Sequence, residues 1–209
     1  MADYDTIVAR VIDETLKFAQ DSTLRPVKQT KGITIHAGNI EGIPETLFRA
    51  TGEIDASPER VVLFVRPGPD TMRAKWDSSS KSMSLVQQVS DTVSIIRTIT
   101  HSAMMGLISA RDFVDLSVLR KLDGTDDWIC AAQSVEHPDT PHEHGLVRGH
   151  NYPCGFWIQS IDGGKRTRFT YVLHTSLRGS LSTSLVESAL PGAQISFFEE
   201  VKKALTKYP

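Results

Sequence analysis

Histidine, glutamate and cysteine residues gather between positions 136 and 154, and these residue types are common zinc ligands. The run His142-Glu143-His144 is followed by His150 and Cys154. Histidines two residues apart on an extended segment point the same way, so the run could present two ring nitrogens to one ion. However, the spacing fits no closed structural zinc site, and the prolines within the run are typical of a surface loop. We therefore interpret the segment as a solvated connection.

Two other combinations could support catalysis. Cys154 lies four residues after His150, which resembles a nucleophile and its base, but no oxyanion donor or orienting carboxylate accompanies them. Arg111 and Asp112 combine a cation with a general base, yet adjacent residues on a strand point to opposite faces. They cannot form one site by themselves. We therefore interpret Arg111 and Asp112 as structural residues, and we predict no catalytic residue and no cofactor.

The composition bounds the class of protein. The chain has 209 residues and a formal net charge of -2, which gives no reason to expect a nucleic-acid partner. Its apolar runs are far shorter than the ~20 residues needed to span a bilayer. The first residues lack the basic start and apolar core of a signal peptide. Cys130 and Cys154 form no disulfide framework, so we expect reduced thiols in a cytoplasmic protein.

Helical periodicity marks the two ends of the chain. Apolar residues at spacings of three and four predict a helix over residues 7–19 and a long helix over residues 186–205. Pro191-Gly192 should bend the second of these near its start. A short helix should begin at Ser57-Pro58-Glu59, which supplies a capping hydroxyl, a proline suited to the first turn and a favourable charge.

Short strands fill the region between the helices. The predicted strands are residues 27–30, 33–36, 47–53, 83–89, 92–100, 112–121, 128–135, 155–161 and 166–175. Tight links at Ser90-Asp91, Asp123-Gly124 and Asp162-Gly163-Gly164 join the last six into three hairpins. Successive hairpins without intervening helices predict an antiparallel sheet, so the fold class is α+β. No linker or repeat divides residues 1–209, and one domain is expected.

The tripeptide Arg111-Asp112-Phe113, with Trp76-Asp77 before it and the run 147–155 after it, resembles the START family of StAR-related lipid-transfer proteins. The resemblance covers nearly the whole chain and is closest to the short, single-domain cytosolic members. It implies a helix-grip fold, in which a long, curved antiparallel sheet wraps around the C-terminal helix. Between sheet and helix, the family has an apolar tunnel that holds one lipid.

The function that this resemblance implies is that of a carrier and not of an enzyme. The protein would bind a hydrophobic small molecule, such as a sterol, bile acid or carotenoid, and move it between membranes through the cytosol. It would be a monomer that contacts a membrane surface transiently. The family's paired acid and arginine fall here on the neutral residues Thr98 and Ser117. This departure argues against a StAR-like cholesterol mode, so hydroxyls, backbone or water should recognise the head group.

The resemblance also indicates which residues contact the ligand. Alternation places Ser94, Ile96 and Thr98 on one face of their strand. That face is either exposed to solvent, as in an ordinary two-sided sheet, or turned toward the tunnel, as the resemblance implies. Residues 101–108 correspond to the family's Ω-loop, whose methionines would either close over the ligand or fill gaps in the core. The predicted ligand-binding residues are Trp76, Ser94, Ile96, Thr98, Met104, Met105, Leu107, Ser117, Cys130, Ala132, Asn151, Leu190, Phe197 and Val201.

Two other functions remain open from the sequence. A pigment carrier would use the same fold and the same tunnel. Helix-grip relatives also include cyclases and hydrolases that carry out chemistry in this cavity. A cluster of His, Asp or Tyr at the centre of the cavity would favour an enzyme, and the predicted wall residues include none.

Overall fold

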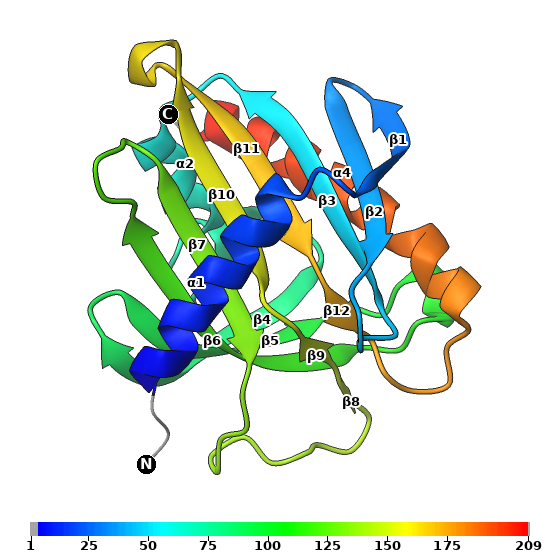
Figure 1. Ribbon diagram of the computed structural model, residues 1–209. Coiled ribbons are helices and arrows are strands. Elements are labelled where there is room, and N and C mark those ends of the chain that lie inside the picture. The colour runs from blue at the N-terminus through cyan, green and yellow to red at the C-terminus, as the bar shows by residue number, and fades with distance from the viewer. Residues whose placement is uncertain (1–3, 209) are drawn as a thin grey trace.

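The computed structural model describes residues 4–208, except for the side chain of Met104 (Figure 1). The prediction about the start of the chain therefore falls partly outside the described residues. The helices are α1 Tyr4–Gln20, α2 Pro58–Val65, α3 Arg73–Trp76 and α4 Thr183–Lys207, with 3-10 turns η1 Met104–Gly106 and η2 Asp162–Gly164. The strands are β1 Arg25–Thr30, β2 Ile33–Asn39, β3 Thr46–Ile54, β4 Ser80–Ser90, β5 Val93–Thr100, β6 Arg111–Lys121, β7 Trp128–Ser134, β8 Val147–Arg148, β9 His150–Asn151, β10 Cys154–Ile161, β11 Arg166–Leu173 and β12 Thr175–Ser176.

One long antiparallel sheet dominates the molecule. Its strands follow the order β1-β2-β3-β11-β10-β7-β6-β5-β4, and β8 adds a short parallel pairing with β6. The three predicted hairpins are present as the antiparallel pairs β4–β5, β6–β7 and β10–β11. Helix α1 crosses one face of the sheet, and α4 lies behind the other (Figure 1). The predicted helix-grip arrangement is confirmed.

The central strands are covered on both faces, which explains why their sequences do not alternate cleanly between apolar and polar. On one face, Val93 and Ile95 of β5 pack against Val11 and Ile12 of α1 in a buried cluster. The opposite face of β5 carries Ile96 and looks toward α4. Burying both faces requires apolar residues at successive positions, which removes the simple period of two.

Several boundaries differ from the sequence-based predictions. Helix α1 ends at Gln20, one residue beyond the predicted end, because Asp21 accepts a hydrogen bond from the backbone N–H of Thr23 at 2.8 Å and forms a turn. Pro26 lies inside β1, which is tolerated because β1 is an edge strand with a register shift after Pro26. The short helix α3 was missed. The last predicted strand is interrupted, with β11 ending at Leu173 and β12 pairing with β9 instead.

Helix α4 buries its second half in an aromatic cluster. The ring of Phe197 lies 5.1–5.2 Å, centre to centre, from the rings of Trp76, Phe156 and Tyr171. Val201 is fully buried in the same core. The sequence analysis placed Phe197 and Val201 at the tunnel. The structure places them in the solid core beside it, because this part of α4 is close enough to the sheet for large rings to fill the space.

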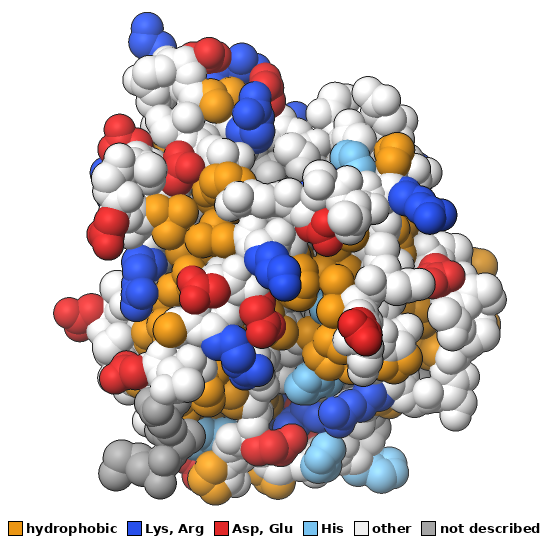
Figure 2. Space-filling model, in the orientation of Figure 1, with side chains coloured by type: hydrophobic (Ala, Val, Ile, Leu, Met, Phe, Trp, Pro, Cys, Tyr) orange, Lys and Arg blue, Asp and Glu red, His pale blue; other side chains and the backbone are white. Residues whose placement is uncertain are grey.

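On the face seen in Figure 2, basic and acidic side chains are interspersed, in agreement with the formal net charge of -2. Among residues 4–208, no helix combines the length and the apolar character that crossing a membrane requires.

Candidate ligand-binding cavity

A cavity of about 240 Å³ lies between the sheet and the first half of α4. Strands β5, β6, β7, β10 and β11 supply most of its wall, and Leu190 and Ala193 of α4 close it. An engineered cavity of ~150 Å³ is already large enough to hold benzene. The space is therefore real, and it is large enough to hold part of a lipid in the conformation described.

The structure brings part of the predicted set to this cavity and leaves part outside. The predicted residues that line it are Ile96, Thr98, Ser117, Cys130, Ala132, Asn151 and Leu190. The face of β5 that carries Ile96 and Thr98 thus looks into the cavity, and the solvent-exposed alternative is wrong for these two residues.

The other predicted residues lie elsewhere. Ser94 does not line the cavity. Trp76 packs against Phe197 and donates its indole N–H to the carbonyl of Phe64 at 3.0 Å, so it is part of the core. Met105 is fully exposed and Leu107 is 64% exposed, both in the loop between β5 and β6. The side chain of Met104 lies outside the described structure.

Asp115 is the main residue that the sequence analysis missed. It lines the cavity from β6, and its two carboxylate oxygens accept hydrogen bonds from Ser134 at 2.7 Å and Asn151 at 2.8 Å. Burial raises the pKa of Asp115 to about 6, although these two hydrogen bonds and nearby Arg73 favour the charged form. Asp115 lies two residues from Ser117, so alternation along β6 was a signal that could have revealed it.

Arg73 is a second charged group in the cavity wall. It donates from Nε to Asp77 at 2.8 Å, and its guanidinium lies 5.0 Å from the ring centre of Phe197 and 5.7 Å from that of Phe156. Burial opposes its charge, but Asp77, Tyr171 and Cys130 together raise the pKa of Arg73 above its usual value. The expectation of a wall without charged groups is therefore wrong. An acid and an arginine are present, but not at positions 98 and 117.

The remaining titratable groups of the cavity are poor catalysts. Burial raises the pKa of Cys130 to about 11 and also raises the pKa values of Cys154 and Tyr171, so all three are neutral near pH 7. A thiol that stays protonated is a weak nucleophile. His150 does not line the cavity, and burial lowers its pKa. Asp115 and Tyr171 are of the residue types whose presence in the cavity would favour an enzyme. The cysteines of this wall, however, are not activated as nucleophiles.

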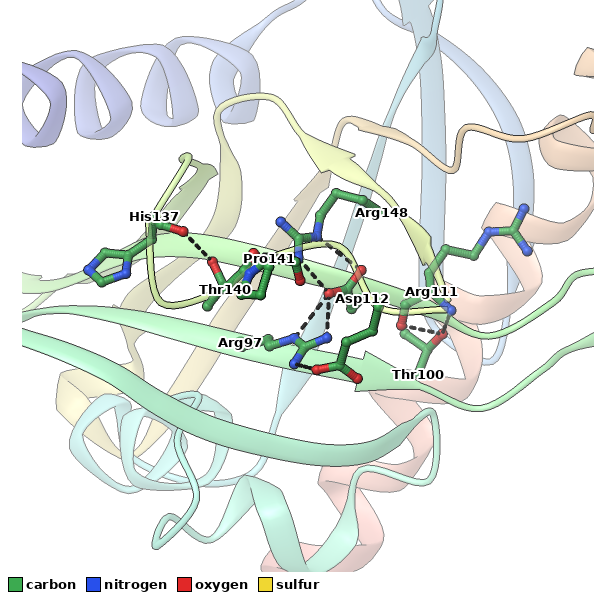
Figure 3. A network of polar contacts seen from close by, with 9 residues as sticks. Arg97, Thr100, Arg111, Asp112, His137, Thr140, Pro141 and Arg148 are labelled. Atoms are coloured by element: carbon green, nitrogen blue, oxygen red, sulfur yellow. Dashed lines mark hydrogen bonds and ion pairs between the residues drawn. The ribbon is translucent and has the colours of Figure 1, made fainter. Parts of the chain in front are cut away.

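The tripeptide that carried the resemblance has a structural role. Asp112, almost completely buried, accepts hydrogen bonds from Arg148 at 3.0 and 2.8 Å and from Arg97 at 3.0 and 2.8 Å (Figure 3). Arg148 also donates to the carbonyl of Thr140, and Arg97 pairs with Glu143. The network fixes the segment after β7 to β5 and β6. The two arginines lower the pKa of Asp112 despite its burial.

Arg111 points away from that network and connects two other segments. Its guanidinium donates to the carbonyls of Ser109, Leu177 and Arg178, the last two at 3.0 and 3.1 Å. Its backbone N–H donates to the hydroxyl of Thr100 at 3.1 Å (Figure 3). Burial lowers the pKa of Arg111. This side chain therefore ties the end of the β5–β6 loop to the segment that leads into α4.

The histidine-rich segment shows no metal-binding geometry. Among residues 4–208, no group of three or more His, Cys, Asp and Glu side chains is arranged to hold an ion. His137 bonds to Gln87 at 3.0 Å, and Thr140 donates to the carbonyl of His137. The segment is a connection held by hydrogen bonds within itself and to Gln87 of β4.

A long curved sheet packed around a C-terminal helix, with a cavity between them, defines a helix-grip fold. The chain belongs to the START domain family, whose model matches residues 28–209. StAR-related lipid transfer protein 5 of Mus musculus is 34% identical over 201 residues, which is 95% of this chain and 93% of that protein. StAR-related lipid transfer protein 6 of Homo sapiens is 29% identical over 205 residues, covering 97% and 92%. The solved structure of human StAR-related lipid transfer protein 5 superposes with a TM-score of 0.92 at 29% identity and covers 98% of this chain and 97% of that one.

Proposed function

We propose that this protein binds one sterol-like or similarly elongated hydrophobic molecule in the cavity and carries it between membranes through the cytoplasm, as a one-domain monomer without catalysis. The observation that carries the proposal is the cavity itself, with the half-buried Asp115 in its wall. Similarity to StAR-related lipid transfer proteins supports the lipid as the class of ligand.

The driving force would be removal of the ligand's apolar surface from water. Burial is worth roughly 25 cal/mol per Å² of apolar surface, so a steroid ring system would gain several kcal/mol before ordering costs. A few polar groups then fix the orientation of the ligand. Above its pKa, Asp115 is a carboxylate that accepts a hydrogen bond, so we expect it to receive a hydroxyl of the ligand.

The cavity must expand to hold a whole lipid. Pockets for drug-sized ligands are typically ~300–1,000 Å³, and the cavity has about 240 Å³. The loop between β5 and β6 is a suitable entrance, because its exposed Met105 and Leu107 can enter the apolar part of a bilayer. Contact with the membrane would therefore be brief and would involve this loop.

The test of this function is direct binding of a fluorescent sterol by the purified protein. Asp115→Leu should weaken binding of a hydroxylated sterol about tenfold, since a charge-assisted hydrogen bond is worth ~1.5–3 kcal/mol. Ser94→Ala is the matched control, because Ser94 is on a neighbouring strand but does not line the cavity. Failure of the wild-type protein to bind any sterol would reject the sterol-like ligand. A visible colour in the native protein would favour a pigment instead.

A further inference from the structure

A second cavity, of about 190 Å³, lies next to the first. Its wall comes from the start of β3, from β12 and the segment that follows it, and from the first turns of α4. Thr175, Leu177 and Leu190 line both cavities, so these three residues form a partition between them. No function discussed so far uses this second space.

The partition between the two cavities has an anchored backbone at Leu177 and apolar side chains at Leu177 and Leu190. Arg111 holds the carbonyl of Leu177 at 3.0 Å, so the chain at this point is anchored to the end of the β5–β6 loop. The side chains of Leu177 and Leu190 are apolar: Leu190 is buried in the main core, and Leu177 packs against it. Connecting the two cavities therefore requires these two side chains to change rotamer, while the anchored backbone of Leu177 stays in place.

The second cavity is apolar inside and charged at its edge. Phe48 and Val186 contribute to its apolar wall, and Glu45, Arg178 and Glu187 also line it. The two carboxylates are already engaged: Tyr152 donates to Glu45 at 2.9 Å, and Thr46 donates to Glu187 at 2.6 Å. Arg178 differs from them. Across residues 4–208, no acidic side chain forms an ion pair with its guanidinium, and Arg178 is exposed.

The helix over this cavity is weakened at its boundary. Pro191 lacks the N–H that would bond to the carbonyl of Glu187. Gly192 follows, and a Cβ placed there would meet nothing within 4 Å, so packing does not require a glycine. Glycine within a helix costs ~0.5–1 kcal/mol relative to alanine. Together these residues mark off the first turns of α4, which cover the second cavity, from the buried remainder of the helix.

We propose that the second cavity is the other half of the ligand site, and that it takes the far end of an elongated amphiphile whose anionic end group pairs with Arg178. This inference rests on the proposed function and specifies its ligand class. One end of the molecule carries a hydroxyl that reaches Asp115. The apolar body passes between Leu177 and Leu190, and the other end carries a carboxylate at the edge of the second cavity.

Three probes separate this inference from the proposed function. They are a hydroxylated steroid without a side chain, the same steroid with a long side chain ending in a carboxylate, and its counterpart ending in an alcohol. Val186→Trp fills the second cavity without touching the first, since Val186 lines only the second. Ser188→Trp is the control, because Ser188 is exposed on the same helix and lines neither cavity.

Val186→Trp should weaken binding of both long steroids by about tenfold or more and leave the short steroid unchanged, while Ser188→Trp alters none of them. Arg178→Gln should weaken the carboxylate probe about threefold to fivefold and spare the alcohol, as expected for an exposed ion pair. If Val186→Trp affects the short and long steroids equally, or affects none, the second cavity is not part of the site. Equal loss of both long probes in Arg178→Gln would overturn the anionic end group.

Two further measurements separate a folding defect from a loss of binding, and the second cavity from the proposed function. If Val186→Trp lowers the melting temperature, Thr183→Trp replaces it, because Thr183 is exposed and also lines the second cavity. Binding of the short steroid by the wild-type protein supports the proposed function whatever the second cavity does. A wild-type protein that binds none of the three probes would reject both.

Discussion

Arg148 holds Asp112 through both carboxylate oxygens, with Nε 3.0 Å from Oδ1 and Nη2 2.8 Å from Oδ2. Arg97 donates to the same Oδ2 from two nitrogens. All three side chains are largely buried. The carboxylate thus pairs with two arginines from different parts of the chain, and Arg97 also pairs with Glu143. Removing the charge of Asp112 takes away the ion pair of the buried Arg148, so this arrangement predicts a large effect of a small change.

Asp112→Asn should lower the free energy of unfolding by about 3–5 kcal/mol, the usual cost of breaking a buried ion pair from one side. Chemical denaturation monitored by circular dichroism measures it. Glu53→Gln is the matched control, because the ion pair of Glu53 with Arg166 is exposed and should be worth less than about 1 kcal/mol. Similar losses in the two variants would show that the Asp112 network has no special role in stability.

The stability of the protein should depend on pH through Asp115. Its pKa is about 6 in the folded protein and ~3.9 in an unfolded chain, so the folded state holds the proton more tightly. Stability from this group is therefore present below pH 4 and lost as the pH rises to about 6. As the pH rises through this window, the free energy of unfolding of Asp115→Asn should increase relative to that of the wild-type protein, by up to about 3 kcal/mol. If the free energies of unfolding of the two proteins differ by the same amount at every pH from 4 to 8, the raised pKa of Asp115 is contradicted.

The exposed loop should govern exchange with membranes and not affinity for the ligand. Replacing Met105 and Leu107 by serine removes two apolar side chains worth roughly 1.5 kcal/mol each when buried in lipid. We expect vesicle binding and lipid transfer to fall about tenfold or more, with equilibrium ligand affinity unchanged. Leu63→Ser, an exposed apolar residue on α2, should leave transfer as it was. Equal effects at Leu63 and in the loop would argue against a specific entrance.

The aromatic cluster should set the stability of the helix-grip. Phe197→Ala removes a ring that contacts Trp76, Phe156 and Tyr171, so we expect a loss of about 3–5 kcal/mol in the free energy of unfolding. Val27→Ala, on an exposed edge strand, should change it by less than about 0.5 kcal/mol. A small loss at Phe197 would mean that the cluster tolerates a cavity or collapses around it.

The order of elements could be predicted from the sequence because turn dipeptides and helical periodicity are local signals. Asp123-Gly124 fixed the β6–β7 hairpin before any packing was known. The face of β5 could not be predicted in this way, since Ile95 and Ile96 are both apolar and both buried. Which one meets α1 and which one meets the cavity depends on helices distant in sequence. Long-range packing decides the burial of a strand, and local pattern does not report it.

Residues of the site could be predicted only where strand alternation and the family resemblance both pointed to the same position. Thr98 and Ser117 were predicted from their family positions, but Asp115, two residues from Ser117, was not among the predicted residues. Its hydrogen bonds come from Ser134 and Asn151, which lie on β7 and β9. A buried carboxylate becomes recognisable when its partners are known, and these partners come together only in the folded chain.

The two faces of the sheet differ in packing: the face under α1 is packed against a helix, and the face toward α4 borders the two cavities. Val11 and Ile12 of α1 share a buried apolar cluster with residues of β5 and β6. The opposite side contains both hollows. A guest can therefore enter and leave by deforming one side alone, while the other preserves the strand register. Loading and release would then be possible many times in the life of one molecule without the hazard of global unfolding.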